Sequence, residues 1–401
     1  MLYIKNDFKT IQMTLFFTDL DDKEKSVYRF LLPRLLTTHT DLIPTKKQMS
    51  TTLEDLYGAY FKPKVERLGN LSISSITYTF VDPKIVGSHT LFHDALDLLN
   101  RVVFEHASFN QDIFNEEKRM LLEQWETLYD KKRQYALYKF NDLFFEDDPY
   151  GYPLSGSYED IKKLTKEKLE AYYRDVFLKN NVRFCVSGNL SDEEIALLKK
   201  LPFTEQSLSF SYVLSFRKPR ELVLVKEPTV MQQAIIKMGY HLPVFRGDKD
   251  YLAAALLDDM IGGSPESRLF MEIRERLGLC YDIQSGYDPY RGVMLISSGV
   301  DLQKMDLAID SIKKEIQKMI NEGPSSEELE HAKAFFSHQL KSSLDSQSVM
   351  IRRKFLEDLL GYNDSVEKRL EDIKHISVED VKRVASLIEL DTIYVLHGEI
   401  K

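Results

Sequence analysis

The sequence predicts an α+β fold of two homologous domains, each with a mostly antiparallel sheet of about six strands and helices packed on one face. The first observation is a repeat: the tetrapeptide EDIK at 159–162 recurs at 371–374, 212 residues later. The second is that Thr165 and Ser377, separated by the same distance, both stand where a helix N-cap is expected. The third is that an apolar, strand-like segment closes each half of the chain. Agreement between several segments at one offset indicates a duplicated α+β unit.

The elements of the first half follow from the spacing of its apolar residues. Alternating apolar residues predict strands at 8–11, 13–17, 71–81 and 182–187. Apolar residues three and four positions apart predict helices at 21–38, 50–60, 89–105, 115–145, 158–164 and 166–177. The helix expected at 115–145 is long and charged, and it carries the only tryptophan, Trp125.

The second half follows the same rules. Strands are expected at 221–225, 232–240, 293–300 and 392–396, and helices at 248–261, 302–321, 325–344, 348–360, 365–374 and 378–387. Between the halves, a mixed polar and aromatic stretch lacks strong signals for either kind of element. We therefore predict an N-terminal domain at 1–201, a linker at 202–220 and a C-terminal domain at 221–401.

Composition restricts the class of protein and its partners. The 401-residue chain is 43% hydrophobic and 29% charged, with a net charge of -9 and a pI of about 5.6, which argues against nucleic acid or an anionic membrane as the main partner. Its two cysteines, Cys185 and Cys280, lie in apolar strand-like runs and are expected to be buried thiols. The N-terminus lacks the apolar core of a signal peptide, and no apolar run approaches membrane-spanning length. We expect a soluble cytoplasmic protein.

The stretch 262–285 is expected to form a helix, a glycine stop and a strand. Ser264 fits an N-cap and Pro265 fits the first helical position. Gly278 stands where a glycine often ends a helix, and alternation beyond it would place Leu279, Tyr281, Ile283 and Ser285 on one face of a strand.

Arg274 and Tyr281 are the candidate binding residues of this stretch. One interpretation is structural: the helix dipole favours a cation in a last turn, and tyrosine is common in strands. The other is functional: a forked cation and a phenolic donor, aimed at one point, could hold a peptide carbonyl or a carboxylate. These residues alone leave both interpretations open.

Several segments resemble one family of zinc peptidases. ESRLFMEIRERLGLCY at 266–281 resembles the C-terminal signature of the pitrilysin/insulinase/mitochondrial-processing-peptidase family. The segment 148–191, which begins DPYGYPLSGS, and EEKRMLLEQ at 116–124 resemble the N-terminal domain of that family. The resemblance covers essentially the whole chain and implies two homologous α+β domains, in agreement with the repeat.

The resemblance also implies a zinc site, from which this sequence departs. Catalytic members carry H-x-x-E-H on a helix, where two histidines bind zinc and the glutamate activates water, with a further glutamate ligand on a later helix. In the matching segment, Phe30 and Arg34 stand at the histidine positions and Pro33 at the glutamate position. Gln124 stands at the later glutamate position, although a shift of one residue would place Glu123 there. We expect no catalytic zinc in this chain.

The other half of the family's site is present. In catalytic members an arginine and a tyrosine seven residues apart hold the substrate backbone near the zinc, and Arg274 and Tyr281 match that spacing. Bacterial members often divide the two roles between two chains, and the segments 8–17 and 55–61 most resemble the non-catalytic one. The resemblance implies a non-catalytic, substrate-binding subunit that pairs with a homologous zinc-bearing subunit and acts on unfolded peptides, with the zinc in the partner.

Two other functions remain open. The chain could be a purely structural or scaffold homologue without a role in proteolysis. Alternatively it could be an independent hydrolase with another metal site, for instance at His89 and His93, which are four residues apart at an expected helix start. No Asp or Glu stands in the sequence as an obvious third ligand for that pair.

Overall fold

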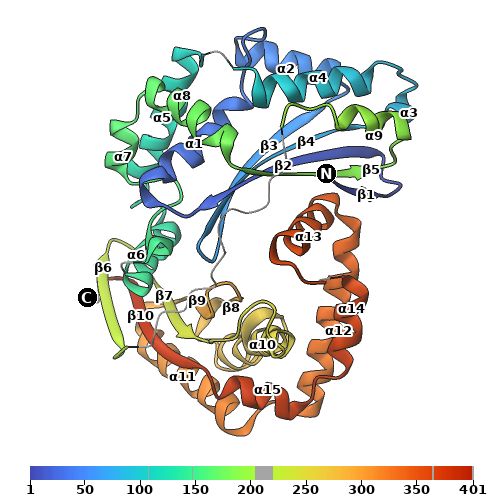
Figure 1. The fold of residues 1–401 in the computed structure, drawn as a ribbon. Coiled ribbons are helices and arrows are strands. Elements are labelled where there is room, and N and C mark those ends of the chain that lie inside the picture. The colour runs from blue at the N-terminus through green and yellow to red at the C-terminus, as the bar shows by residue number, and fades with distance from the viewer. Residues whose placement is uncertain (107, 147, 204–219, 364, 400–401) are drawn as a thin grey trace. The chain divides into compact units, whose positions relative to one another are not determined.

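A computed structural model describes residues 1–106, 108–146, 148–203, 220–363 and 365–399 of the chain (Figure 1). The strands are β1 Leu2–Lys5, β2 Thr10–Leu20, β3 Tyr60–Leu68, β4 Leu71–Val81, β5 Asn181–Gly188, β6 Val223–Thr229, β7 Gln233–His241, β8 Cys280–Asp288, β9 Val293–Asp301 and β10 Glu389–Gly398. The helices are α1 Ser26–Leu36, α2 Lys46–Asp55, α3 Pro83–Val86, α4 Leu91–Phe104, α5 Gln111–Glu126, α6 Lys132–Phe145, α7 Tyr158–Lys163, α8 Lys166–Asp175, α9 Asp192–Leu198, α10 Tyr251–Asp258, α11 Met305–Glu322, α12 Ser326–Ser342, α13 Gln347–Leu360, α14 Val366–Lys374 and α15 Val378–Ala385. Two segments, η4 Asp259–Gly263 and η5 Phe270–Arg276, are π-helical, and the 3-10 turns are η1 Lys23–Lys25, η2 Pro149–Gly151, η3 Phe177–Lys179, η6 Leu302–Lys304 and η7 Ser343–Asp345.

The strands form two sheets with the same topology, which confirms the predicted fold class. Sheet 1 has the order β1-β5-β2-β4-β3 and sheet 2 the order β6-β10-β7-β9-β8. In each sheet the first pair is parallel and the remaining pairs are antiparallel. Thr165 caps α8 and Ser377 caps α15, each accepting a hydrogen bond from a backbone N–H of the first turn. Five described strands build each sheet, close to the expected number of about six.

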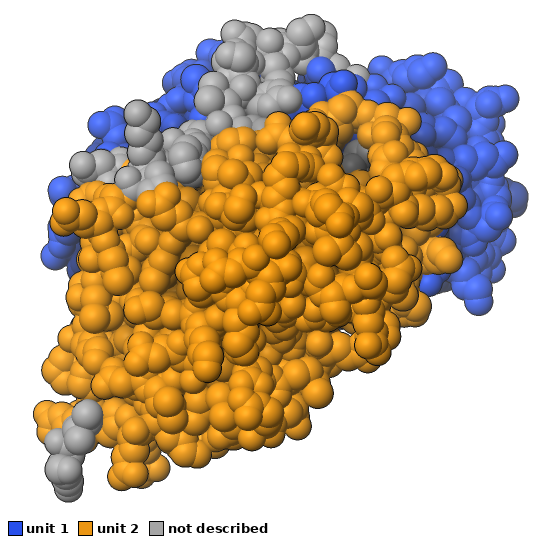
Figure 2. All heavy atoms as spheres, turned by 90° about the horizontal axis from the view of Figure 1, so that it is seen from below, with its two compact units in different colours: residues 1–127, 152–212, 344–361 blue, residues 128–151, 213–343, 362–401 orange. Residues whose placement is uncertain are grey.

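Contacts divide the chain into two compact units, which Figure 2 colours separately. Unit 1 consists of 1–127, 152–212 and 344–361, and unit 2 consists of 128–151, 213–343 and 362–401. Each unit therefore combines segments that are far apart in sequence. The boundaries predicted from the sequence, 1–201, 202–220 and 221–401, remain a proposal for how the repeats divide, and 204–219 of the predicted linker lie outside the described residues.

Sheet 1 is covered on both faces. Alternating β2 residues such as Met13, Leu15 and Phe17 are at most 1% exposed and pack in one core with α1, α4, α5 and α8. The opposite face of β2 meets α13, where the Phe355 and Phe16 rings stack with centroids 3.9 Å apart. Helix α13 comes from the second half of the sequence, so one face of sheet 1 is covered by a helix of the other repeat.

Sheet 2 is built in the same way. Its inner face packs against α10, α11 and α15, and its other face packs against α6, whose Phe140 and Phe144 lie in a cluster with Tyr394 and Leu396. The α6 helix lies so close to β7 that a Cβ at Gly239 would come within 2.6 Å of the Phe144 ring, so glycine is needed there. Helix α6 comes from the first half of the sequence. The two repeats have thus exchanged one helix each.

Two expected helices have different boundaries. The single helix predicted at 115–145 is wrong: α5 ends at Glu126, a turn follows, and α6 begins at Lys132. The helix predicted at 50–60 begins and ends earlier, as α2 Lys46–Asp55, because Tyr57 and Gly58 both adopt positive φ (59° and 74°), a left-handed conformation that ends helices. The strand β3 begins two residues after Gly58, where the sequence prediction had none. Among the described residues, no helix has the length and hydropathy needed to cross a membrane.

A buried pair of histidines lies in the core of unit 1. The His39 and His106 rings lie 5.3 Å apart, and His39 is 2% exposed. Its Nε2 accepts a hydrogen bond of 3.0 Å from the backbone N–H of Asn110, so the ring is held neutral. Burial, and then the neighbouring His106, lowers the pKa of His39 to about 4, and burial lowers the pKa of His106 as well.

This pair predicts that unit 1 loses stability in mild acid. As the pH falls below 6.5, the unfolded chain binds protons at these histidines that the folded chain does not, so the free energy of unfolding falls until about pH 4. We expect His39 to account for a loss on the order of 1–2 kcal/mol. Urea denaturation followed by the fluorescence of Trp125, a unit 1 residue and the only tryptophan, measures this slope. His39→Gln should have a shallower slope than the wild type, and equal slopes would contradict the assignment.

Candidate functional site

Arg274 lies in the π-helical segment η5, with its side chain open to solvent. Its guanidinium carbon stands 4.5 Å from the centroid of the Phe270 ring, one turn earlier. Its Nε lies 3.7 Å from a carboxylate oxygen of Glu275, and the side chain is 40% exposed. An aromatic ring thus supports the cation from one side while leaving most of its forked N–H donors available.

Tyr281 lies at the start of β8, where the strand is irregular. The pairing of β8 with β9 shifts register between Cys280 and Asp282, so Tyr281 falls outside the regular alternation. The predicted shared face is wrong for Tyr281: Leu279 and Ile283 are buried, whereas Tyr281 is 55% exposed. The phenolic O–H donates a hydrogen bond to Asp301, and this bond raises the pKa of Tyr281. The phenol therefore remains protonated, as a hydrogen-bond donor must be.

The helix start predicted at Ser264 and Pro265 is also wrong. Ser264 does not cap a new helix: it follows η4, which continues α10, and its hydroxyl donates to the carbonyl of Asp259 at 3.3 Å. Helical backbone resumes only at Arg268. Gly262 allows η4 to approach β8, because a Cβ there would come within 2.8 Å of the Ser285 nitrogen. The predicted stop at Gly278 is confirmed by its left-handed φ of 58°.

The structure therefore places Arg274 and Tyr281 on two elements that pack against each other. Segment η5 contacts β8, and both belong to unit 2. Both side chains are accessible, and each is oriented by a neighbour, Phe270 for the arginine and Asp301 for the tyrosine. These two supporting residues carry no motif signal, because their role depends on side-chain packing. The binding role of the pair remains a prediction at this point.

The positions of the zinc motif lie on α1 and do not fit a metal. Phe30 and Arg34, which stand where histidines are required, interact with each other: the guanidinium carbon of Arg34 lies 5.0 Å from the centroid of the Phe30 ring. Pro33 is buried inside the helix and has no group that could activate water. A phenyl ring, a pyrrolidine ring and a cation offer no ligand to Zn²⁺.

The position of the later glutamate ligand, on α5, does not make up for the missing zinc ligands on α1. Gln124 is exposed on α5, and Glu123 forms an ion pair of 2.5 Å with Arg119 one turn earlier. Across the described residues, no group of three or more His, Cys, Asp or Glu side chains is placed to hold a metal ion. His89 and His93 are both exposed, and His89 precedes Thr90, the N-cap of α4, so the two do not share a helical face.

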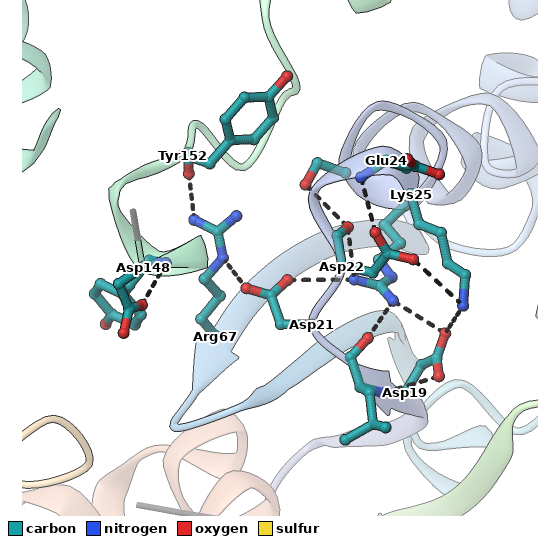
Figure 3. A network of polar contacts seen from close by, with 12 residues as sticks. Asp19, Asp21, Asp22, Glu24, Lys25, Arg67, Asp148 and Tyr152 are labelled. Atoms are coloured by element: carbon teal, nitrogen blue, oxygen red, sulfur yellow. Dashed lines mark hydrogen bonds and ion pairs between the residues drawn. The ribbon is translucent and has the colours of Figure 1, made fainter. Parts of the chain in front are cut away.

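A network of buried charges, partly drawn in Figure 3, fixes the start of α1. Arg29 is 2% exposed and forms ion pairs with Asp19 at 3.0 Å and Asp21 at 3.2 Å. Asp21 also accepts a hydrogen bond of 2.6 Å from Arg67 of β3, whose guanidinium donates to the carbonyl of Tyr152. Burial raises the pKa of Asp21 despite these two arginines. The sequence predicts no such network, and its visible signal is the acidic run before α1.

Comparisons with known proteins place this chain among peptidase-like relatives. Residues 163–336 match the sequence family described as "Peptidase M16 inactive domain". "Probable inactive metalloprotease YmfF" of Bacillus subtilis is 23% identical and aligns with 98% of this chain and 93% of its own length. "Uncharacterized zinc protease YmxG" of the same bacterium is 26% identical over 78% of this chain and 76% of its own length.

Solved structures with the same fold cover the whole chain. A conserved protein from Enterococcus faecalis is 25% identical, has a TM-score of 0.91, and is matched over 100% of this chain and 96% of its own. A peptidase M16 inactive domain from Pseudomonas fluorescens is 18% identical with a TM-score of 0.81, matched over 100% of this chain and 95% of its own. Together with the α1 positions that cannot bind zinc, these findings confirm the resemblance expected from the sequence: residues 163–336 match the inactive domain of peptidase M16, and the whole chain is similar to proteins described as inactive members of that family.

Proposed function

We propose that this chain is the non-catalytic, substrate-binding subunit of a heterodimeric zinc metallopeptidase that cuts unfolded peptides. One observation carries the proposal: α1 has no zinc-binding side chain at the motif positions, while Arg274 and Tyr281 are present, accessible to solvent and supported by neighbours. Bacillus subtilis contains a similar protein described as a probable inactive metalloprotease and another described as an uncharacterized zinc protease, which supports the proposal.

In this proposal the partner subunit carries out the zinc chemistry and this chain holds the peptide. The homologous partner supplies the zinc ion and the carboxylate that activates water. Arg274 donates two forked N–H groups to a peptide carbonyl, and Tyr281 turns its single phenolic O–H, which Asp301 accepts in the free chain, toward the peptide. The chain itself needs no cofactor for this role. We place the pair in the cytoplasm, where peptides from protein turnover are available.

Reconstitution tests this proposal. The isolated chain is expected to bind no stoichiometric zinc and to cleave no peptide. Mixing it with a homologue from the same organism that carries H-x-x-E-H should give a one-to-one complex with peptidase activity that neither chain has alone. Light scattering after size exclusion, zinc analysis and cleavage of an unfolded peptide provide the three measurements.

Two other outcomes would assign a different role to the chain. A complex whose partner cuts equally well without this chain would identify a scaffold. Stoichiometric zinc together with cleavage by the isolated chain would identify an independent hydrolase. Either result would overturn the proposed role.

A further inference from the structure

Unit 2 contains a pocket of about 410 Å³ beside the π-helical segment η4. One wall is formed by a single face of α12, which contributes Glu328, His331, Ala332 and Phe335. The loop after η4 supplies the other wall with Pro265 and Glu266, and Asp259 and Met260 of η4 complete the lining. The volume lies in the range of pockets that hold small organic ligands.

Asp259 is the unusual group of this pocket. It is 7% exposed, and its Oδ2 is buried without a hydrogen-bond partner among the described residues. Burial, and then the neighbouring Asp258, raises the pKa of Asp259 to about 7. A buried carboxyl group without a partner is costly, and native proteins rarely retain one unless something else pairs with it. Asp259 also lines the pocket, so a donor that enters lies next to this residue.

The other ionisable side chains of the pocket have polar partners. Arg268 pairs with both oxygens of Glu328, at 2.5 and 2.9 Å. At the rim, Nδ1 of His331 lies 3.3 Å from Glu266, and both of these side chains are more than half exposed. A ligand that enters therefore meets one unpaired buried acid.

The walls determine the chemical class of ligand. Met260, Pro265, Ala332 and Phe335 line the pocket with apolar surface, which suits an aliphatic chain rather than a hydrated ion. A metal ion is a poor fit, because no three ligating side chains converge anywhere among the described residues. A cation carried on an alkyl stem satisfies both the acid and the walls.

We propose that this pocket binds a primary ammonium group on an aliphatic stem, the chemistry of a lysine side chain, with the ammonium donating to the carboxylate of Asp259. The site is separate from Arg274 and Tyr281, and it does not depend on the proposed peptidase role. The same chemistry can come from a free alkylamine or from lysine within a peptide, and the experiment separates these two sources.

The test measures binding to the full chain by isothermal titration calorimetry. The probes are n-butylamine, for a free amine, and Nα-acetyl-lysine methylamide, for a lysine within a peptide. The uncharged control is Nα-acetyl-norleucine methylamide, which keeps the stem but lacks the ammonium. We expect at least one amine to bind and the norleucine probe to bind at least about 10-fold more weakly, because only a charged donor pairs with the buried acid.

Two variants locate the site. Asp259→Asn keeps the shape of the side chain and removes its charge, and it should weaken amine binding at least about 10-fold. Glu266→Gln removes an exposed rim charge and should change the affinity less than about 3-fold. Equal binding of the amine and norleucine probes to the wild-type chain, no amine binding, or equal loss in both variants would each overturn the proposal. Because the probe comparison uses the wild-type chain, it stays decisive even if Asp259→Asn fails to fold.

Discussion

Replacing Arg274 by alanine is expected to lower the turnover of the reconstituted heterodimer by about two to three orders of magnitude. The guanidinium is the one permanent cation of the proposed binding pair, and the Phe270 ring holds it in place before any peptide arrives. Its loss removes forked donors that both position the peptide and stabilise charge on a carbonyl oxygen. Tyr281→Phe removes a single neutral donor, so we expect about a 10-fold effect. Steady-state cleavage of an unfolded peptide gives both values.

Arg276 provides a matched control on the same segment. It lies two residues beyond Arg274, is more exposed, and pairs with Glu272 one turn earlier. Arg276→Ala should leave turnover close to the wild-type value, and all three variants should still form the complex in size exclusion. Wild-type turnover in both Arg274→Ala and Tyr281→Phe would show that the pair does not hold substrate. Loss of assembly would instead place these residues at the subunit interface.

The largest effect on stability is expected from Arg29→Ala. This change removes a buried cation that pairs with the carboxylates of Asp19 and Asp21, and it removes donors to two backbone carbonyls. Breaking one side of a buried ion pair typically costs about 3–5 kcal/mol. Arg67 still contacts Asp21 in the variant, which places the expected loss toward the lower end of that range. The urea midpoint of unit 1, followed by Trp125 fluorescence, should fall accordingly.

Arg34→Ala on the same helix is the control for this change. Arg34 is half-buried, and its described contact is with the Phe30 ring at 5.0 Å. Loss of such a cation–π contact should cost less than about 1 kcal/mol. If both alanine variants shift the midpoint equally, the charge network is not what anchors α1.

Local signals explain how much of the fold could be predicted from the sequence. Helix caps such as Thr165 and Ser377 depend on bonds within one turn, so their repeat showed the duplication directly. The break between α5 and α6 had no such signal, because the turn at 127–131 contains neither glycine nor proline. The sequence also could not predict which sheet α13 packs against. Periodicity identifies the apolar face of a helix, but it does not identify the sheet that this face contacts.

At the candidate site too, contacts between distant segments could not be predicted from the sequence. Spacing and resemblance pointed to Arg274 and Tyr281, and the structure adds the bulge in β8 that turns the tyrosine outward. Nothing in the sequence around Asp259 distinguishes it from an ordinary helix carboxyl group. Its burial arises from the π-helical turn and from α12, which lies much later in the chain.

The exchange of α6 and α13 has a consequence for the origin of this architecture. A single copy of the repeat, folded alone, would leave the outer face of its sheet, including Phe16 in one case and Tyr394 in the other, without a covering helix. Two identical copies could solve this problem by each donating the helix to the other, which is a symmetric domain-swapped dimer. Joining the copies in one chain would make the same exchange intramolecular and raise the effective concentration of each helix at the sheet that it covers. The ancestor implied by this arrangement is a homodimer whose two copies could diverge after fusion.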